Sequence, residues 1–204
     1  MLLDILKEKK CFKLVCGAGN KDAKEVEKLV ALYSLAGCNF FDINASIEIL
    51  NAAKKGLEFS KIKKDRYICI SVGIKGDPHI SKAYVDETKC IHCNLCSEVC
   101  LQKAISNGYV KEKKCIGCNK CLKICPKKAI KTIDKLKDLK EILPPLIKEG
   151  IDCIEFHTIS NDETSIQEKW QEINDLYNGP LSICIDRSNL GNKQLISRLN
   201  NKIG

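Results

Sequence analysis

The sequence predicts an α/β protein: a parallel β/α domain, partly barrel-like, with a cysteine-rich α+β segment inserted into it. Two observations lead to this fold class. Short apolar runs suited to buried strands alternate with stretches of helical periodicity on both sides of the segment. Between them the alternation stops, and eight of the 14 cysteines gather within residues 90–125. We therefore expect an N-terminal β/α part at 1–80, an insert at 81–133 and a continuation of the β/α domain at 134–204.

The first β/α unit begins with the apolar strand candidate Phe12–Cys16. Asp22, with Glu25 three residues later, is typical of a helix N-cap. A helix is expected to follow and to end at Gly37. Its apolar residues recur at helical spacing, namely Val26, Leu29, Val30 and Tyr33.

The next unit repeats the pattern. Asn39–Ile43 is a second strand candidate, and Ser46 is the expected N-cap of a second helix. Gly56 is expected to end that helix, and Tyr67–Val72 is the third strand. The order β-α-β-α-β with continuous apolar strands is typical of a buried parallel sheet.

The same rhythm returns after residue 133. Two more strands are expected at Ile151–Phe156 and Leu181–Ile185. The first helix of this part is expected to be interrupted or restarted at Pro144 and Pro145. The apolar residues of the three helices are Leu136, Leu139, Ile142, Leu143 and Leu146; Ile166, Trp170, Ile173 and Tyr177; and Leu195, Ile196 and Leu199.

Five strands are too few for a closed barrel. Without the insert the strands begin roughly 30 residues apart, which is the step of a β/α barrel or a doubly wound sheet. A closed eight-stranded barrel needs on the order of 250 residues. The expected forms are an open sheet, a half-barrel that pairs with another copy, or a truncated version of a longer domain, which we favour slightly.

The eight clustered cysteines form an internal repeat whose two copies lie 25 residues apart. Each copy has the spacing C-x2-C-x2-C-x3-C, and only the second is followed by proline. Two such runs resemble the bacterial-type ferredoxin module with two [4Fe–4S] clusters. Three thiolates of one loop can bind three irons of a cube, and the fourth must come from the other repeat. The two expected ligand sets are Cys90, Cys93, Cys96 and Cys125, and Cys115, Cys118, Cys121 and Cys100.

A pair of Zn(Cys)4 sites is the alternative to clusters. Zinc sites use two C-x2-C pairs, whereas these runs hold four cysteines each, so we favour iron–sulfur clusters. Leu101 stands where the second repeat has Pro126, which changes a turn but removes no ligand. Lysines are dense in the insert. They balance the charge of anionic clusters, or form a docking face for an acidic redox partner; we favour the former.

Further candidate residues lie near the carboxyl ends of the strands, at the edge of the sheet where β/α proteins carry their functional loops. We expect the clusters to lie beside any pocket that these residues line. For each residue a structural role is the commoner case: Cys16 as a buried small hydrophobe, His79 and His157 as hydrogen-bonded histidines, and His92 as a spacer. The residues are Cys16–Asn20, Asp42, Asn44, Gly76–His79, Glu155, His157, Thr158, Asp186 and Arg187.

Composition excludes several classes of protein. No apolar run approaches about 20 residues, and residues 1–10 lack the apolar block of a signal peptide, so we expect a cytoplasmic protein without a membrane span. In a reducing cytosol, 14 cysteines indicate metal ligation rather than disulfides. The net charge of +8 is partly offset by anionic clusters, so we do not expect nucleic-acid binding.

Several segments together resemble the cyanobacterial light-dependent period (LdpA) family. The resemblance implies an iron–sulfur redox sensor that feeds light-dependent redox state into the circadian clock. It also implies clock-input proteins as partners. Typical members of the family are longer than this chain. We therefore expect the chain to lack a C-terminal part of their barrel-like domain. The segments are Phe12–Asn20, Leu35–Cys38, Asp42 and Ile43, Gly76–His79, the two cysteine repeats, and Glu155–Thr158.

Three functions follow, in order of preference. The first is a redox sensor with two [4Fe–4S] clusters, and the second is a ferredoxin-type electron-transfer subunit of an oxidoreductase. The third is an enzyme with a flavin or substrate at the β/α face, which ranks last because the sequence shows no flavin or nucleotide fingerprint. No catalytic residue is predicted.

Overall fold

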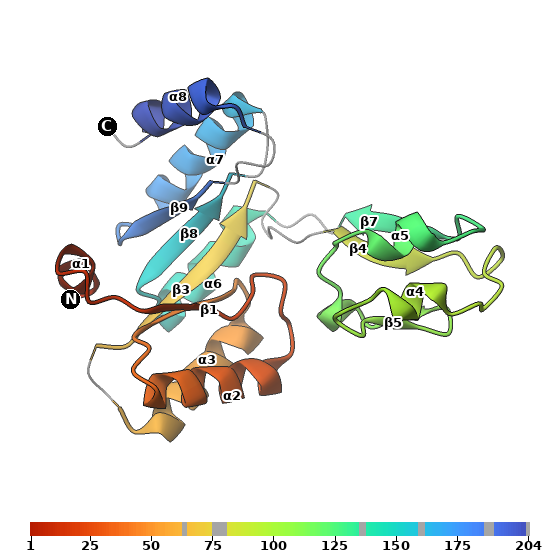
Figure 1. Ribbon diagram of the computed structural model, residues 1–204. Coiled ribbons are helices and arrows are strands. Elements are labelled where there is room, and N and C mark those ends of the chain that lie inside the picture. Colours follow the sequence, from red (N-terminus) through yellow and green to blue (C-terminus); the bar gives the residue numbers. More distant parts are fainter. Residues whose placement is uncertain (63–64, 75–80, 135–137, 159–161, 186–189, 203–204) are drawn as a thin grey trace.

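A computed structural model describes residues 1–62, 65–74, 81–134, 138–158, 162–185 and 190–202 (Figure 1). Among them, five parallel strands form one sheet in the order β1-β2-β3-β8-β9. The sheet is curled into a half-barrel, which confirms the expected mixed α/β class and its parallel sheet. The strands are β1 (Lys13–Val15), β2 (Phe40–Asn44), β3 (Tyr67–Gly73), β8 (Cys153–His157) and β9 (Leu181–Cys184).

The outer face of the sheet holds the main apolar core. Alternate strand residues such as Phe41, Ile70 and Phe156 are buried there, because successive side chains of a strand point to opposite faces. Asp22 and Ser46 cap the first two covering helices as expected, since each side chain accepts a backbone N–H of the first turn. The helices are α2 (Ala23–Leu35), α3 (Ile47–Ser60), α6 (Leu139–Glu149) and α7 (Glu163–Leu176), with α8 (Asn192–Lys202) after β9.

A short helix that the sequence does not predict, α1 (Leu2–Lys7), precedes the sheet. Its buried Leu2 belongs to a small second core with Phe40, Cys69 and Cys153, which lie on the inner face of the sheet. A helix of six residues is too short to give a clear periodicity in the sequence. It covers the part of the inner face where these core residues lie.

Two of the expectations about the helices, one end and one interruption, are wrong. α3 does not end at Gly56 but continues to Ser60, and Gly56 faces α2. A Cβ at Gly56 would lie 2.5 Å from the carbonyl oxygen of Glu27, so glycine is needed for close helix packing. α6 is also not interrupted, although Pro144 and Pro145 lie inside it. Both prolines are exposed, so water can reach the carbonyls that lose their N–H partners, while Leu139, Leu143 and Leu146 anchor the opposite side.

The cysteine-rich segment is a separate α+β arrangement beside the sheet (Figure 1). The segment begins with β4 (Ser81–Val85) and ends with β7 (Ile130–Asp134), and these two strands pair antiparallel. Between them lie α4 (Leu95–Glu98), the hairpin of β5 (Ile105–Ser106) and β6 (Tyr109–Val110), a 3-10 turn at Glu112–Lys114, and α5 (Lys120–Ile124). No described helix has both the length and the apolar character needed to cross a membrane.

Candidate functional site

The eight cysteines of the insert surround two cavities. One cavity is lined by Cys90, Cys93, Cys96 and Cys125, and the other by Cys100, Cys115, Cys118 and Cys121. Each group therefore takes three cysteines from one repeat and the fourth from the other. The structure brings together the members of each expected set; that they bind metal stays a prediction.

The backbone repeats with the same offset as the sequence. Asn94 and Asn119, which precede α4 and α5, both have a φ of 60°, and Lys103 and Lys128 have φ values of 48° and 49°. His92 and Gly117 also correspond, with φ values of 52° and 68°. Because left-handed backbone is rare outside glycine, its recurrence at matched positions shows that both loops follow one path. His92 is thus the counterpart of a glycine within its loop.

The sulfur atoms have backbone donors. Cys100 Sγ accepts the N–H of Ala104 at 3.2 Å, and Cys125 Sγ accepts that of Ala129 at 3.3 Å. Cys115 Sγ accepts a third N–H, from β4, at 3.4 Å. In the same group, burial raises the pKa of Cys121 to about 11. Clustered, partly buried thiols can ionise together only with a cation among them, so the residues present suit a thiolate-bound iron–sulfur group.

A buried lysine adds positive charge beside the second group. Lys82 on β4 is 3% exposed, and its Nζ donates to the carbonyl oxygen of Cys115 at 2.6 Å. Gly117 in the same loop lies against the backbone of Ser81, so a side chain there would collide with β4. The loop of the second repeat is therefore fixed directly to the antiparallel pair.

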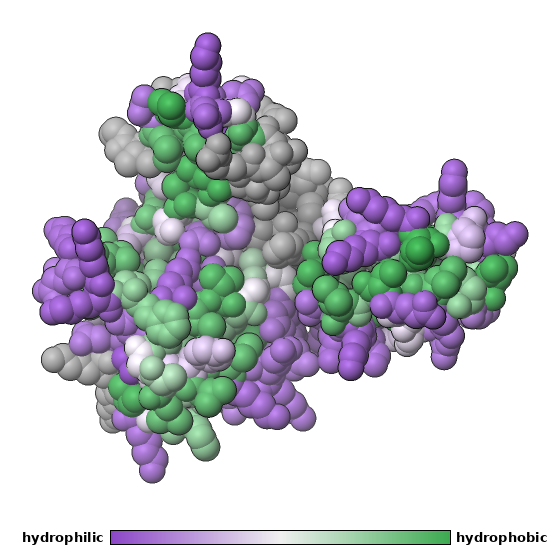
Figure 2. All heavy atoms as spheres, viewed as in Figure 1, coloured by the Kyte–Doolittle hydropathy of each residue, from purple (hydrophilic) through white to green (hydrophobic). Residues whose placement is uncertain are grey.

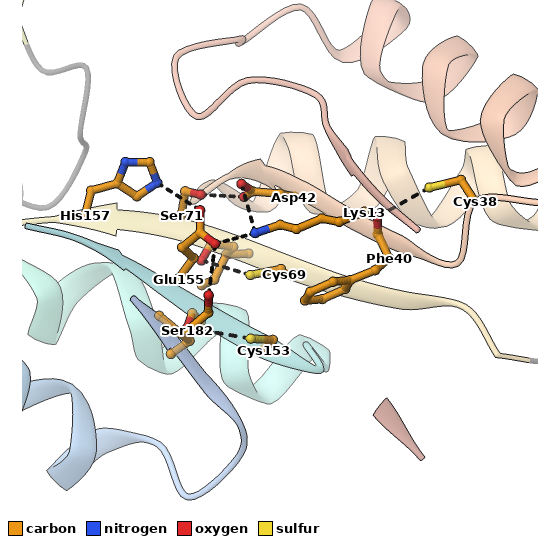
Figure 3. A network of polar contacts seen from close by, with 12 residues as sticks. Lys13, Cys38, Phe40, Asp42, Cys69, Ser71, Cys153, Glu155, His157 and Ser182 are labelled. Carbon is orange, nitrogen blue, oxygen red and sulfur yellow. Dashed lines mark hydrogen bonds and ion pairs between the residues drawn. The ribbon is translucent and has the colours of Figure 1, made fainter. Parts of the chain in front are cut away.

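The inner face of the half-barrel carries a separate polar network (Figure 3). Lys13 Nζ of β1 contacts Glu155 Oε2 of β8 and lies 3.6 Å from Asp42 Oδ2 of β2. Ser71 donates to Asp42, and Ser182 Oγ donates to Glu155 Oε2 at 3.0 Å. All five side chains share one face, because the register pairs Asp42 with Cys69, Ser71 with Glu155, and Glu155 with Ser182.

The network shifts the pKa values of its members. Burial raises the pKa of Asp42 to about 6, although the Lys13 ammonium opposes the shift. Burial also acts against ionised Glu155, but the nearby His157 imidazole and the Lys13 ammonium outweigh it and lower the pKa of Glu155 to about 2. Burial disfavours protonated His157, but contacts with Cys184 and Glu155 raise its pKa to about 9. The inner face is therefore strongly charged at neutral pH.

Several residues expected near the strand ends lie in or beside this network. Asp42, Glu155 and His157 belong to it, and Asn44 is buried next to it on β2 with its Nδ2 bound to the carbonyl of Ala18. Lys13, Ser71, Ser182 and Cys184 were missed, because apolar strand runs hide single polar residues until the register is known. Gly76–His79, Asp186 and Arg187 lie outside the described residues.

The insert meets the β/α domain at the loop between β1 and α2. A cleft of about 460 Å³ is lined on one side by Gly17 and Asn20 and on the other by Leu101 and Ile116. The N–H of Lys21 donates to the carbonyl of Lys113 at 3.4 Å. Lys113 Nζ in turn lies 3.2 Å from Glu48 Oε1 on α3. Leu101 and Ile116 directly follow Cys100 and Cys115, so the second cysteine group adjoins this contact.

Comparison with known proteins identifies relatives of the chain. Residues 80–136 match the LdpA Fe-S cluster-binding domain. Over 176 residues the chain is 31% identical to "Light dependent period A" of Synechococcus elongatus, a match that covers 84% of this chain and 50% of that protein. The chain thus spans about half the length of the curated relative it matches. No solved structure matches it significantly.

Proposed function

Because the chain belongs to the LdpA family, we propose that it is an iron–sulfur protein with two [4Fe–4S] clusters and senses redox state for light-dependent circadian input. The insert would be a ferredoxin-type module, acting in the cytoplasm, with clock-input proteins as partners. The observation that carries the proposal is the division of the eight cysteines into two crossed groups of four, each around its own cavity.

Cys90, Cys93, Cys96 and Cys125 would hold one cluster, and Cys115, Cys118, Cys121 and Cys100 the other. Bound clusters would supply one-electron chemistry. The chain itself supplies the N–H donors to sulfur and the buried ammonium of Lys82. Both stabilise negative charge at the cysteines, and so favour the reduced state of a cluster.

The contact between the insert and the β1–α2 loop supports sensing rather than simple electron transfer. Ile116 and Leu101 connect the second cysteine group to the cleft opposite Gly17 and Asn20. A change of charge or a loss of ligation at Cys100 or Cys115 would therefore be felt across this contact. An electron carrier needs no such connection.

Hydrogen exchange of oxidised and reduced protein tests this proposal. Altered protection is expected at Gly17–Asn20 and at His157–Thr158, with little change on the outer helices α6 and α7. Gly76–His79 is expected to respond as well. Changes confined to residues 81–133 would instead favour an electron-transfer subunit, for which the exposed Cys93 and Cys118 offer routes to a partner.

Metal analysis tests the clusters themselves. Anaerobically purified protein is expected to hold about eight irons and about eight acid-labile sulfides per chain. Two zinc ions without labile sulfide would refute the cluster proposal.

A further inference from the structure

The inner face of the half-barrel holds a second group of metal-binding side chains, distant in sequence from the insert. Glu155, His157 and Cys184 each offer a ligand atom, and these three atoms lie within 4.8 Å of one another. A carboxylate oxygen, an imidazole nitrogen and a thiol sulfur are the three donor types found in zinc sites. We propose that Glu155, His157 and Cys184 bind one divalent transition-metal ion of the zinc class.

The strands explain why these side chains converge. Glu155 and His157 are two residues apart on β8, so both point to the inner face. Cys184 of β9 is the register partner of His157 and points to the same face. They sit at the carboxyl ends of two parallel strands, where β/α proteins place their sites.

Two of the candidate ligand atoms face each other at the site. His157 Nε2 is buried and makes no hydrogen bond among the described residues, although it lies 3.3 Å from Glu155 Oε1. Lys13 and Ser182 both contact Oε2 of Glu155, which leaves Oε1 facing the histidine. The neighbours thus orient the carboxylate without occupying the oxygen that faces His157, as residues around metal ligands commonly do.

The charges also suit a divalent cation. Metal binding requires Cys184 as thiolate and His157 as neutral imidazole. In that state the thiolate, Glu155 and Asp42 carry three negative charges, against one positive charge on Lys13. An ion of charge +2 would neutralise the difference. With only three protein ligands, a fourth coordination position would stay open for water or a small ligand.

The surrounding backbone holds the ligands in place. Thr158 N and Oγ1 donate to the carbonyl of Cys184 at 3.0 and 3.1 Å, which joins the ends of β8 and β9. Arg198 of α8 is 1% exposed and donates to the carbonyl of Thr158 at 2.8 Å. Such support is required of a site that must keep three ligands at fixed separations.

The test uses the full chain with its iron–sulfur groups loaded, titrated anaerobically with Zn2+ and studied by zinc-edge X-ray absorption. We expect about one zinc bound, with one sulfur at about 2.3 Å and nitrogen or oxygen ligands at about 2.0–2.1 Å. The sulfur count separates this site from the insert, since zinc that displaces iron there would have four sulfur neighbours. Iron content is measured before and after the titration.

Cys184→Ser is expected to remove the sulfur neighbour and to weaken zinc binding at least tenfold. The matched control Cys11→Ser changes a partly buried cysteine outside the site and should leave the sulfur neighbour and the zinc affinity unchanged.

Tryptophan fluorescence reports whether each variant folds, because Trp170 is the single tryptophan and contacts Phe156 of β8. If Cys184→Ser is unfolded, His157→Gln takes its place and is expected to weaken binding at least tenfold. No zinc retained by the parent chain, a four-sulfur environment, or equal zinc binding by the folded variant would overturn the proposal.

Discussion

The insert and the inner face of the half-barrel both gather metal-binding side chains, but they do so in different ways. In the insert, six of the eight cysteines lie in two short segments of the chain, and even the crossing between repeats follows from a fixed spacing. On the inner face, Lys13, Asp42, Ser71, Glu155 and Ser182 come from five strands and meet only through the sheet register. Local spacing can be read from a sequence, whereas a site assembled by register requires the fold.

The two regions also differ in what supports them. The half-barrel has a large apolar core, with Phe41, Ile70 and Phe156 among its buried residues. The core of the insert is small, with Ala83, Val85, Ala104, Ile105 and Ile130 beside the cysteines themselves. Ligation would therefore supply much of the insert's stability, while burial stabilises the half-barrel.

The largest expected effect is on the insert after iron is chelated. Residues 81–134 should lose hydrogen-exchange protection by several orders of magnitude, because structural metals contribute on the order of 10 kcal/mol to small domains. Strands β2 and β3 should keep their protection, and Trp170 emission should not change. An insert that stays protected without iron would show that its apolar core is sufficient, and the comparison would fail.

The next effect concerns the crossing of the ligand sets. Cys125→Ser is expected to lower the iron content from about eight to about four per chain, through loss of the cluster held by Cys90, Cys93 and Cys96. Electron paramagnetic resonance of the variant should retain the signal of the other centre. Cys11→Ser is the control and should keep all the iron. If Cys125→Ser instead removes the centre of Cys115, Cys118 and Cys121, the ligand sets are not crossed.

Much of the fold could be predicted because its elements carry local signals. The five strands and the caps Asp22 and Ser46 agree with the structure to within a few residues. Gly56 was misread as a helix end, because a glycine needed for helix packing looks the same in sequence as one that ends a helix. α1 gave no periodic signal over its six residues.

The candidate sites divide in the same way. The grouping of the cysteines follows from a repeat that the amino-acid sequence alone shows. Asp42, Glu155 and His157 could be noted because they lie near the carboxyl ends of strands and within segments that resemble a known family. Lys13 and Ser182 lie within apolar runs, where a single polar residue is ambiguous until its register partner is known. Their roles depend on contacts between residues as far apart as 13 and 155.

Lys13→Met is expected to destabilise the half-barrel by about 3 kcal/mol, because it leaves two buried carboxylates without their cation. Lys24→Met, on the exposed side of α2, is the matched control and should change stability little. Urea unfolding followed by Trp170 emission measures both. Iron content should stay the same in each variant, since the network lies outside the insert. A loss of iron in Lys13→Met would show that the two regions do not behave separately.

The smallest expected effect is a pH dependence that belongs to the inner face alone. Burial raises the pKa of Asp42 from 3.8 to about 6, so between these values the folded state holds a proton that the unfolded state has released. The contribution of Asp42 to the free energy of unfolding is therefore lost as the pH rises from 3.8 through about 6. Lys13, Ser71, Glu155 and His157 all act on Asp42, and they are unchanged in Asp42→Asn.

Comparing the parent chain with Asp42→Asn isolates this contribution. Between about pH 5 and about pH 7.5 the parent should lose roughly 1.4 kcal/mol more than the variant, a tenfold difference in the unfolding constant. The measurement is urea unfolding at each pH with Trp170 emission as the signal, because that residue reports on the half-barrel and not on the insert. An identical pH dependence in the two proteins would mean that Asp42 is already ionised throughout this range. The Lys13 ammonium would then outweigh burial, and the inner face would be a closed salt-bridge network rather than one with a carboxylate poised near neutral pH.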